Sequence, residues 1–383
     1  MKKENAKDII LPHTQAKLDL YRSYLEKYLP ILTLAKGISK INLYDIFCGI
    51  GLYKDGNLGS PMISVETINK TNELVDSKGW KRKQVNLTVN DGNEEKIENV
   101  KMLLIDVSMS NCKITYHNLD ADDMLNVASS EIANFSNSER SLVFIDPYGY
   151  SKIDKQKILS LLNNGHTEIV LFLPTMQMYR FSEVALTDLE RKCYEDLRRF
   201  ILEFISSTDN FQDIFEFINA ITKAFSFSDR FYSCSHYIER GKGNYYAIFF
   251  ITSNIYGLER MLEVKWKQDP SQGKGFKRKK QVGLFDELLI EYDRKRELEN
   301  LRAILINELS ISSEGISNTE IYSLTLKNEF LPKHVNEIIK QLRADNKIYT
   351  TDEFGNENNF GNATYIDYDH YKKNSIKIYF KLK

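Results

Sequence analysis

Two glycines at the end of an apolar run are the residues whose spacing first suggests chemistry. Residues 41–51 read Ile-Asn-Leu-Tyr-Asp-Ile-Phe-Cys-Gly-Ile-Gly, so a predicted β-strand ends in Gly49 and Gly51. Backbone without side chains lets a ligand approach closely, and ligands of open α/β sheets bind at the carboxyl ends of the strands. Asp45, Phe47 and the two glycines have the form D-x-F-x-G-x-G. A tight strand-to-helix turn would also explain the glycines.

Acidic residues end the next two predicted strands. Asp91 follows the alternating run 85–89, and Asp120, or else Asp122, follows residues 114–116. A carboxylate at the first position can accept hydrogen bonds from ribose hydroxyls, and one at the second could meet an adenine amino group. Each acid alone could instead be a solvated loop residue or a helix N-cap. Their order after the glycines predicts a nucleoside cofactor, and D-x-F-x-G-x-G is the pattern that holds S-adenosylmethionine.

A further strand end carries Asp146-Pro147-Tyr148-Gly149. A site that methylates an exocyclic amine must hold the NH₂ group with acceptor atoms. An Asp carboxylate and the neighbouring proline carbonyl can supply them, while an aromatic ring stacks on the flipped-out base. The amino-methyltransferase motif is D-P-P-Y, and one proline is missing here. Catalytic roles for Asp146, Pro147 and Tyr148 therefore compete with a turn that only closes the cofactor pocket.

Cysteine chemistry is disfavoured. The form D-x-F-x-G-x-G also opens cytosine-C5 methyltransferases, which attack with the thiolate of a Pro-Cys pair. None of the four cysteines here follows a proline, and no Cys-x-x-Cys pair or His cluster suggests a metal site. We expect no metal site, and reduced thiols in a cytoplasmic compartment.

The concentrated basic cluster of the chain lies within residues 265–280, near Trp266 and Phe276. Basic side chains interleaved with aromatic ones suit phosphate contact and base stacking, although a solvated linker has the same composition. The predicted nucleic-acid contacts are Lys274, Lys277, Arg278, Lys279 and Lys280.

Alternating strands and helices must position these residues. Helical spacing predicts helices at residues 13–35, 62–69 and 94–106, between runs that predict strands. This order favours an α/β domain with a parallel, doubly wound, Rossmann-like sheet. The predicted strands are the run that begins at residue 41 and residues 85–89, 114–116, 141–145, 168–173 and 245–252.

The 383 residues are enough for two or three domains. We predict a first domain over residues 1–270 with a helical insertion at 176–240, a basic linker at 271–285, and a winged helix-turn-helix at 286–383. The winged helix rests on three predicted helices followed by β-like residues. Ser317 and Glu320 have capping-box spacing at the start of its second helix.

The third helix of that unit is the predicted recognition helix. It carries Lys333, His334, Lys340 and Arg343. Such a helix can read DNA in the major groove or dock a protein. The net charge of −1 gives no global attraction to nucleic acid. No run approaches ~20 apolar residues, so we expect no membrane span. The first residues are rich in Lys, Glu and Asp and contain no apolar segment, so we expect no secretion signal.

With these residues in place, the chain resembles the three-Cys-motif partner proteins (TcmP), a bacterial family of methyltransferase-like proteins. The resemblance covers about residues 13–276. It rests on five ordered blocks: His13-Thr14 with Lys17 and Tyr24-Leu25, residues 44–51, Gly59-Ser60-Pro61, residues 144–149, and Met261, Lys265-Trp266, Asp269-Pro270 and Gly273. Family members usually have a small residue and then Gly-Pro-Gly in the cofactor loop, so Cys48 and Ile50 depart from the family. The family's second strand usually ends in Glu, for which Asp91 is the nearest match.

The resemblance implies a methyltransferase-like protein that works with a three-Cys-motif partner encoded nearby, on DNA or RNA. We expect S-adenosylmethionine-dependent methyl transfer to a base nitrogen. The alternative is a fold that has lost catalysis and serves as a cofactor-binding or docking subunit, with the winged helix as its interaction module. A DNA-binding regulator would leave the first domain unexplained. The expected cofactor contacts are Asp45, Phe47, Gly49, Gly51, Asp91, Asp120 and Asp122.

Overall fold

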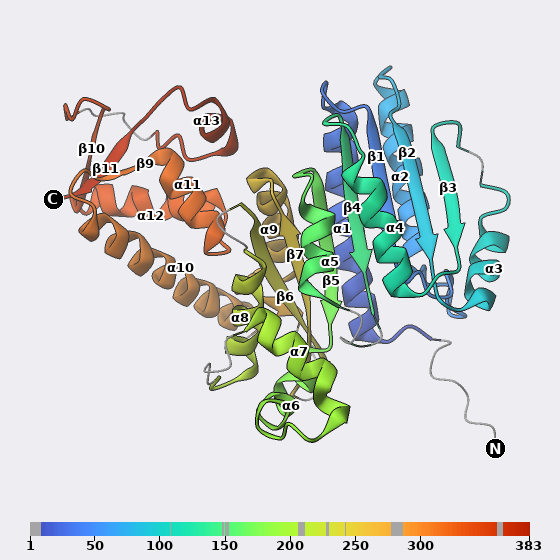
Figure 1. Ribbon diagram of the computed structural model, residues 1–383. Helices are drawn as coiled ribbons and strands as arrows, with labels where there is room; N and C mark the ends of the chain where they lie inside the picture. Colours follow the sequence, from blue (N-terminus) through green and yellow to red (C-terminus); the bar gives the residue numbers. More distant parts are fainter. Residues whose placement is uncertain are drawn as a thin grey trace. The chain divides into compact units, whose positions relative to one another are not determined.

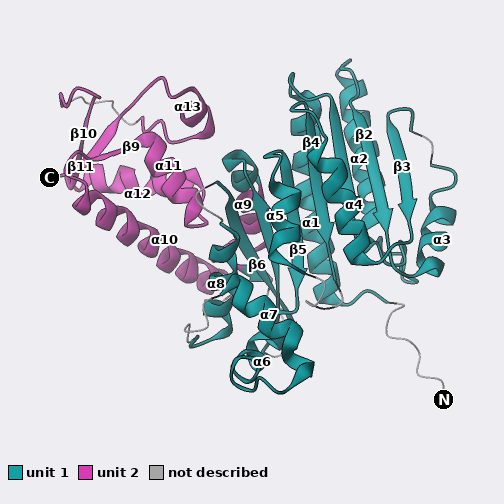
Figure 2. Cartoon of the chain, viewed as in Figure 1, with its two compact units in different colours: residues 1–260, 275–278 teal, residues 261–274, 279–383 magenta. Residues whose placement is uncertain are grey.

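The structure is a computed structural model in which two compact units can be described separately. Unit 1 comprises residues 1–260 and 275–278, and unit 2 comprises residues 261–274 and 279–383 (Figure 2). The described residues are 9–107, 109–147, 149, 153–205, 211–226, 230–241, 243–276, 286–357 and 363–383.

The described part of unit 1 is built on an eight-stranded sheet with the order β3-β2-β1-β4-β5-β7-β6-β8 (Figure 1). Strands β1 to β5 are parallel, and β7 is antiparallel to both of its neighbours. This order confirms the predicted Rossmann-like sheet. The strands are β1 (Lys40–Asp45), β2 (Gln84–Asn90), β3 (Cys112–His117), β4 (Glu139–Ile145), β5 (Thr167–Leu173), β6 (Tyr232–Gly241), β7 (Asn244–Thr252) and β8 (Gly275–Phe276).

Helices cover both faces of this sheet, with α1 and α2 on one side and α4 and α5 on the other (Figure 1). Because both faces are covered, β4 ends in a buried apolar run at residues 142–145 and β5 in a buried apolar run at residues 169–173. The ring of Tyr21 stacks on Phe144 on the α1 side, while Val143 packs into the opposite core. The helices of this unit are α1 (Pro12–Leu34), α2 (Ser60–Ser77), α3 (Glu94–Leu103), α4 (Ala121–Ala133), α5 (Lys155–Leu162), α6 (Thr175–Thr187), α7 (Glu195–Phe204) and α8 (Ile214–Phe225), with a 3₁₀ turn at Lys192–Tyr194. Helix α9 (Ile255–Gln268) begins in unit 1, and its residues from Met261 onward belong to unit 2.

The predicted helical insertion at 176–240 differs from the structure at its end. Helices α6, α7 and α8 occupy its first part, but Tyr232–Gly241 form strand β6. The strand forms because residues 232–239 and Gly241 pair with β7, a contact between segments that helical spacing cannot reveal. Pro30 lies inside α1, which continues to Leu34.

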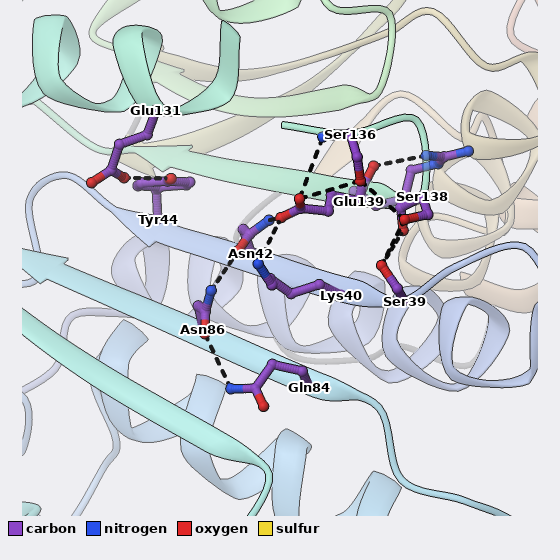
Figure 3. A network of polar contacts seen from close by, with 11 residues as sticks. Ser39, Lys40, Asn42, Tyr44, Gln84, Asn86, Glu131, Ser136, Ser138 and Glu139 are labelled. Atoms are coloured by element: carbon purple, nitrogen blue, oxygen red, sulfur yellow. Dashed lines mark hydrogen bonds and ion pairs between the residues drawn. The ribbon is translucent and has the colours of Figure 1, made fainter. Parts of the chain in front are cut away.

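A network of polar contacts links β1, β2 and β4 near their amino ends (Figure 3). The predicted site lies at the other, carboxyl ends of these strands. Asn42 and Asn86 are register partners, and the Asn86 amide donates to Asn42 Oδ1 at 2.8 Å. Asn42 in turn donates to Glu139, which also pairs with Lys40. These bonds satisfy polar groups between parallel strands and fix the register that aligns the opposite ends.

The described part of unit 2 has three main helices and a three-stranded antiparallel sheet, in the order β10-β11-β9. The predicted capping box at Ser317 and Glu320 is confirmed. The helices and strands of unit 2 are α10 (Asp286–Ile311), β9 (Ile316–Ser317), α11 (Asn318–Lys327), α12 (Pro332–Ala344), β10 (Ile348–Thr351), α13 (Tyr368–Lys373) and β11 (Tyr379–Leu382).

His334 is a correction to the predicted recognition surface of α12. Its ring is buried against Trp266, and its Nδ1 accepts the Leu331 N–H at 3.2 Å. Burial, and then the charges of Lys333 and Arg294, lower the pKa of His334 to about 3. The ring is therefore a neutral helix cap, and among the four basic residues only Lys333 and Lys340 are classed as exposed.

Candidate functional site

A cavity of about 370 Å³ opens in unit 1 at the carboxyl ends of β1, β4 and β5. One wall is the loop from Phe47 to Gly51 with Gly59 and Ser60. Facing residues come from the start of α1, from β5 and from the β6–β7 hairpin. Ligands of doubly wound sheets bind at this edge.

The loop after β1 owes its shape to glycine. Gly49 and Gly51 have φ of 66° and 78°, a conformation that other residues adopt at a cost. A side chain on Gly49 would meet nothing within 4 Å, whereas one on Gly59 would lie 2.9 Å from the Gly51 oxygen. The loop thus presents bare backbone to the cavity at Gly49 and packs tightly behind it. Both predicted glycines line the cavity, as does Phe47.

Asp45 lies beneath this loop, 1% exposed at the end of β1. Neither carboxylate oxygen has a hydrogen bond of normal geometry among the described residues, although Ser60 and the Phe47 N–H act to lower its pKa. Burial is the largest effect, and the charges of Asp146 and Asp91 add to it. Together they raise the pKa of Asp45 to about 7.

Asp91 supports the glycine loop from the end of β2. One oxygen accepts the Gly49 N–H at 3.2 Å, and Lys96 donates to both oxygens at 2.9 and 3.1 Å. Asp91 is 4% exposed and is not among the residues that line the cavity, whereas Lys96 is. The structure therefore places Asp91 where it holds the loop.

Asp120 and Asp122 lie at the start of α4. Asp120 is exposed and caps that helix by accepting the Asp122 N–H at 3.1 Å, and the Asp122 carboxylate pairs with Lys157 at 2.9 Å. Neither lines the cavity. These are the helix-cap and surface roles that the sequence left open, and the structure does not bring the two residues together with the glycine loop.

Asp146 and Pro147 both line the cavity, at the end of β4. Asp146 Oδ2 forms a short ion pair with Lys17 of α1, whose side chain is only 10% exposed. Oδ1 has no hydrogen-bond partner among the described residues. The third residue of this predicted set, Tyr148, lies outside the described residues.

Sequence reasoning missed the wall that faces the glycine loop. It consists of Phe172 from β5, Tyr246 from β7, Arg240 from β6 and His13 with Lys17 from α1. The Phe172 and Tyr246 rings stack with centroids 5.2 Å apart. Lys17 Nζ lies 4.7 Å from the centre of Phe172, and the Arg240 guanidinium 5.7 Å from that of Tyr246. His13 and Lys17 appear in the family-like block at the start of the chain, which was the available signal.

The predicted basic cluster lies mostly outside the described residues, which exclude Lys277, Arg278, Lys279 and Lys280. Lys274 is described, and its Nζ pairs with Glu297 of α10 at 2.7 Å within unit 2. In the described part of the chain no group of three or more His, Cys, Asp or Glu side chains is arranged to hold a metal ion. No described helix combines the length and apolar character needed to cross a bilayer.

No protein-family model matches the chain, and no curated protein matches it. Three solved structures with a distant likeness to the chain are the following. An O-methyltransferase from Bacillus cereus in complex with SAH is 13% identical, with 64% of this chain and 82% of that chain covered and a TM-score of 0.32. Magnesium protoporphyrin IX methyltransferase from Synechocystis PCC 6803 with bound SAH is 9% identical, with 63% and 87% covered and a TM-score of 0.31. Loganic acid methyltransferase with SAH is 9% identical, with 78% and 92% covered and a TM-score of 0.33. At such TM-scores we conclude nothing from them about this chain.

Proposed function

We propose that unit 1 binds S-adenosylmethionine and transfers its methyl group to a base nitrogen of a nucleic acid. The observation that carries the proposal is the meeting of two strand ends in one cavity. Bare backbone at Gly49 and Gly51 and the Asp146-Pro147 pair line the same 370 Å³ space. A cofactor and an acceptor amine can therefore lie side by side there.

The residues of the loop fit the cofactor. Open space faces Gly49 where a side chain would project, so the backbone can approach a ligand closely. Beneath it the two oxygens of Asp45 lack normal hydrogen bonds among the described residues, although buried polar groups are usually satisfied. Asp45 does not itself line the cavity, so its predicted contact with the cofactor would need the loop above it to shift. Phe47 and Ser60 add an apolar face and a hydroxyl to the same wall. S-adenosylmethionine would supply an electrophilic methyl group on a sulfonium.

Asp146 and Pro147 would hold the acceptor. Asp146 Oδ1 can accept a hydrogen bond from an exocyclic amine while Lys17 fixes the carboxylate through Oδ2. Such a bond holds the nitrogen lone pair toward the methyl group. When the nitrogen gains a methyl group, it must lose one proton, and the carboxylate is a base placed to accept it.

Several finer features belong to the same proposal. Unit 2 would act as a winged helix. Its chain order of a helix, a short strand, two helices and two antiparallel strands, with the short helix α13 between the last two strands, supports this role. Exposed Lys333 and Lys340 on α12 suit phosphate contact. Membership of the TcmP family and a three-Cys-motif partner rest on the sequence resemblance alone, and a cytoplasmic location rests on the scattered cysteines.

Methyl transfer tests this function directly. Purified protein is incubated with methyl-labelled S-adenosylmethionine and mixed DNA and RNA, with and without a co-expressed partner. Label on nucleic acid is the expected result. Tight cofactor binding without label on any acceptor, both with and without the partner, would contradict the proposal that the protein is an enzyme.

One observation favours the second candidate, a non-catalytic cofactor-binding or docking subunit. The Asp146 carboxylate already has a short ion pair with Lys17 through Oδ2, so it has a structural partner that does not require an acceptor. A lost reaction would leave that pair as a structural contact between α1 and β4. The same labelling experiment separates the two candidates.

A further inference from the structure

The wall opposite the glycine loop has a composition of its own. Described residues on this side provide the aromatic rings of Phe172, Tyr246 and His13, with Lys17 and Arg240 beside them. The rings of His13 and Tyr246 are nearly parallel, at an interplanar angle of 7°, and Tyr246 stacks on Phe172 at 17°. An approximately parallel set of rings offers surface on which a planar ring can stack.

Exposure changes systematically along this wall. Phe172 and Lys17 are buried, at 7% and 8% exposed, whereas Tyr246 and His13 are half-buried and Arg240 is exposed. The apolar ring surface therefore lies deep in the cavity, and the guanidinium lies at its mouth. A ligand that matches this order has a planar apolar part inside and a charged part in contact with solvent.

The cations at this wall differ in what they already bind. Lys17 is paired with Asp146, and Lys96 on the other side of the cavity is paired with Asp91. Arg240 donates to the Tyr246 hydroxyl at 2.5 Å and has no carboxylate partner among the described residues. Its charge is therefore available to an anion at the mouth.

His13 adds no positive charge to this wall near neutral pH. Burial, and then the charges of Arg240 and Lys17, lower its pKa to about 4, although Asp146 opposes them. The neutral imidazole is a flat ring with one donor and one acceptor nitrogen. It suits contact with a heterocycle better than contact with a phosphate.

We propose that this wall is a subsite for one nucleotide of a nucleic-acid strand, with the base inside against Phe172 and Tyr246 and its phosphate on Arg240 at the mouth. The inference rests on the proposed function. It adds that the base and the phosphate of the acceptor nucleotide bind to different residues of the wall. A base taken out of its helix brings its phosphate to the rim of the pocket. Arginine suits the phosphate because its guanidinium can donate two parallel hydrogen bonds.

The test titrates nucleosides and their 5′-monophosphates into the protein by calorimetry. S-adenosylhomocysteine is first titrated alone and then kept saturating, so that adenine-containing probes cannot occupy the cofactor half. We expect at least one monophosphate to bind tenfold or more tightly than its nucleoside. Arg240→Gln should remove that preference, and Arg240→Lys should retain part of it.

Arg82→Gln is the matched control, because Arg82 is a surface arginine of the same unit that pairs with Asp76 and does not line the cavity. It should keep the preference for the phosphate. Equal binding of nucleoside and monophosphate, binding of neither, or a preference that survives Arg240→Gln would overturn the subsite. If S-adenosylhomocysteine fails to bind while the Arg240-dependent preference remains, the proposed methyl transfer fails and the subsite stands.

Discussion

At the scale of single residues, Gly49 allows two effects of a substitution to be measured separately: backbone strain and loss of space for a ligand. Gly79 has the same φ of 66° and equally open surroundings, but it lies outside the cavity. Gly49→Ala and Gly79→Ala should therefore cost similar strain, about 1–2 kcal/mol each, seen as equal losses in unfolding free energy. Only Gly49→Ala should weaken S-adenosylmethionine binding, by tenfold or more in calorimetry. Equal affinities in the two variants would show that the loop does not touch the cofactor.

Asp146 separates transfer from cofactor binding. Asp146→Asn keeps the shape of the side chain but removes the base and the charge that pairs with Lys17. We expect label transfer to fall at least 100-fold, while the Kd for S-adenosylmethionine stays within tenfold, or roughly 1.4 kcal/mol. Thermal unfolding of the same variant reports the cost of leaving Lys17 without its carboxylate. Unchanged turnover would remove the catalytic role of Asp146.

Asp45 predicts a pH dependence of stability. Its pKa is raised from 3.8 to about 7 in the folded protein, so the folded state keeps a proton that the unfolded state loses as the pH rises above 4. Stability due to this group is therefore lost between about pH 4 and pH 7, by about 4 kcal/mol in the limit. In urea unfolding, the unfolding free energy of Asp45→Asn should increase relative to that of the wild type as the pH rises across this range. The same measurement on Glu168→Gln is needed to separate the two carboxyl groups, because burial also raises the pKa of Glu168 to about 7. A difference between Asp45→Asn and wild type that does not change with pH would contradict the raised pKa.

At the scale of elements, the strands of the parallel sheet could be predicted because β1, β4 and β5 contain apolar runs, while β2 alternates apolar and polar residues and β3 is short and β-like. Only half of the candidate site could be predicted from local sequence patterns. Phe47, Gly49, Gly51, Asp146 and Pro147 follow their own strands, so local sequence places them at one edge. The opposite wall depends on the pairing of β7 between β5 and β6, which joins residues far apart in the chain. Local patterns carry no information about such pairing, and so Arg240 and Tyr246 were missed.

The capping box of α11 gives an element-scale prediction for unit 2. The Ser317 hydroxyl accepts the Glu320 N–H, and the Glu320 carboxylate accepts the Ser317 N–H at 2.9 Å. Ser317→Ala should lower the unfolding free energy by about 1 kcal/mol, because it leaves a helix-terminal donor without its partner. Ser310→Ala, at an exposed position near the end of α10, is the control and should change it by under about 0.5 kcal/mol. Equal effects would show that the box adds no stability.

At the scale of the whole molecule, the sequence combines near-zero net charge with chemistry concentrated at one edge of one sheet. Attraction to a polyanion must then come from a few local cations, such as Arg240 in unit 1 and Lys333 and Lys340 in unit 2. These three described cations would give a slope of roughly −3 in a plot of log K against log salt, and engagement of the predicted contacts Lys277, Arg278, Lys279 and Lys280 as well would steepen it to roughly −6. A filter-binding series from 50 to 300 mM salt measures it. A slope near −8 would show a broad electrostatic surface instead.

The most direct measurement is calorimetric titration of the purified full chain with S-adenosylmethionine and with S-adenosylhomocysteine. The cavity at Gly49 and Gly51 predicts saturable binding of both at one site per chain. Absence of binding for either compound, at protein concentrations where a Kd of about 100 μM or about −5.5 kcal/mol would be seen, would contradict the central claim that this sheet edge holds a nucleoside cofactor.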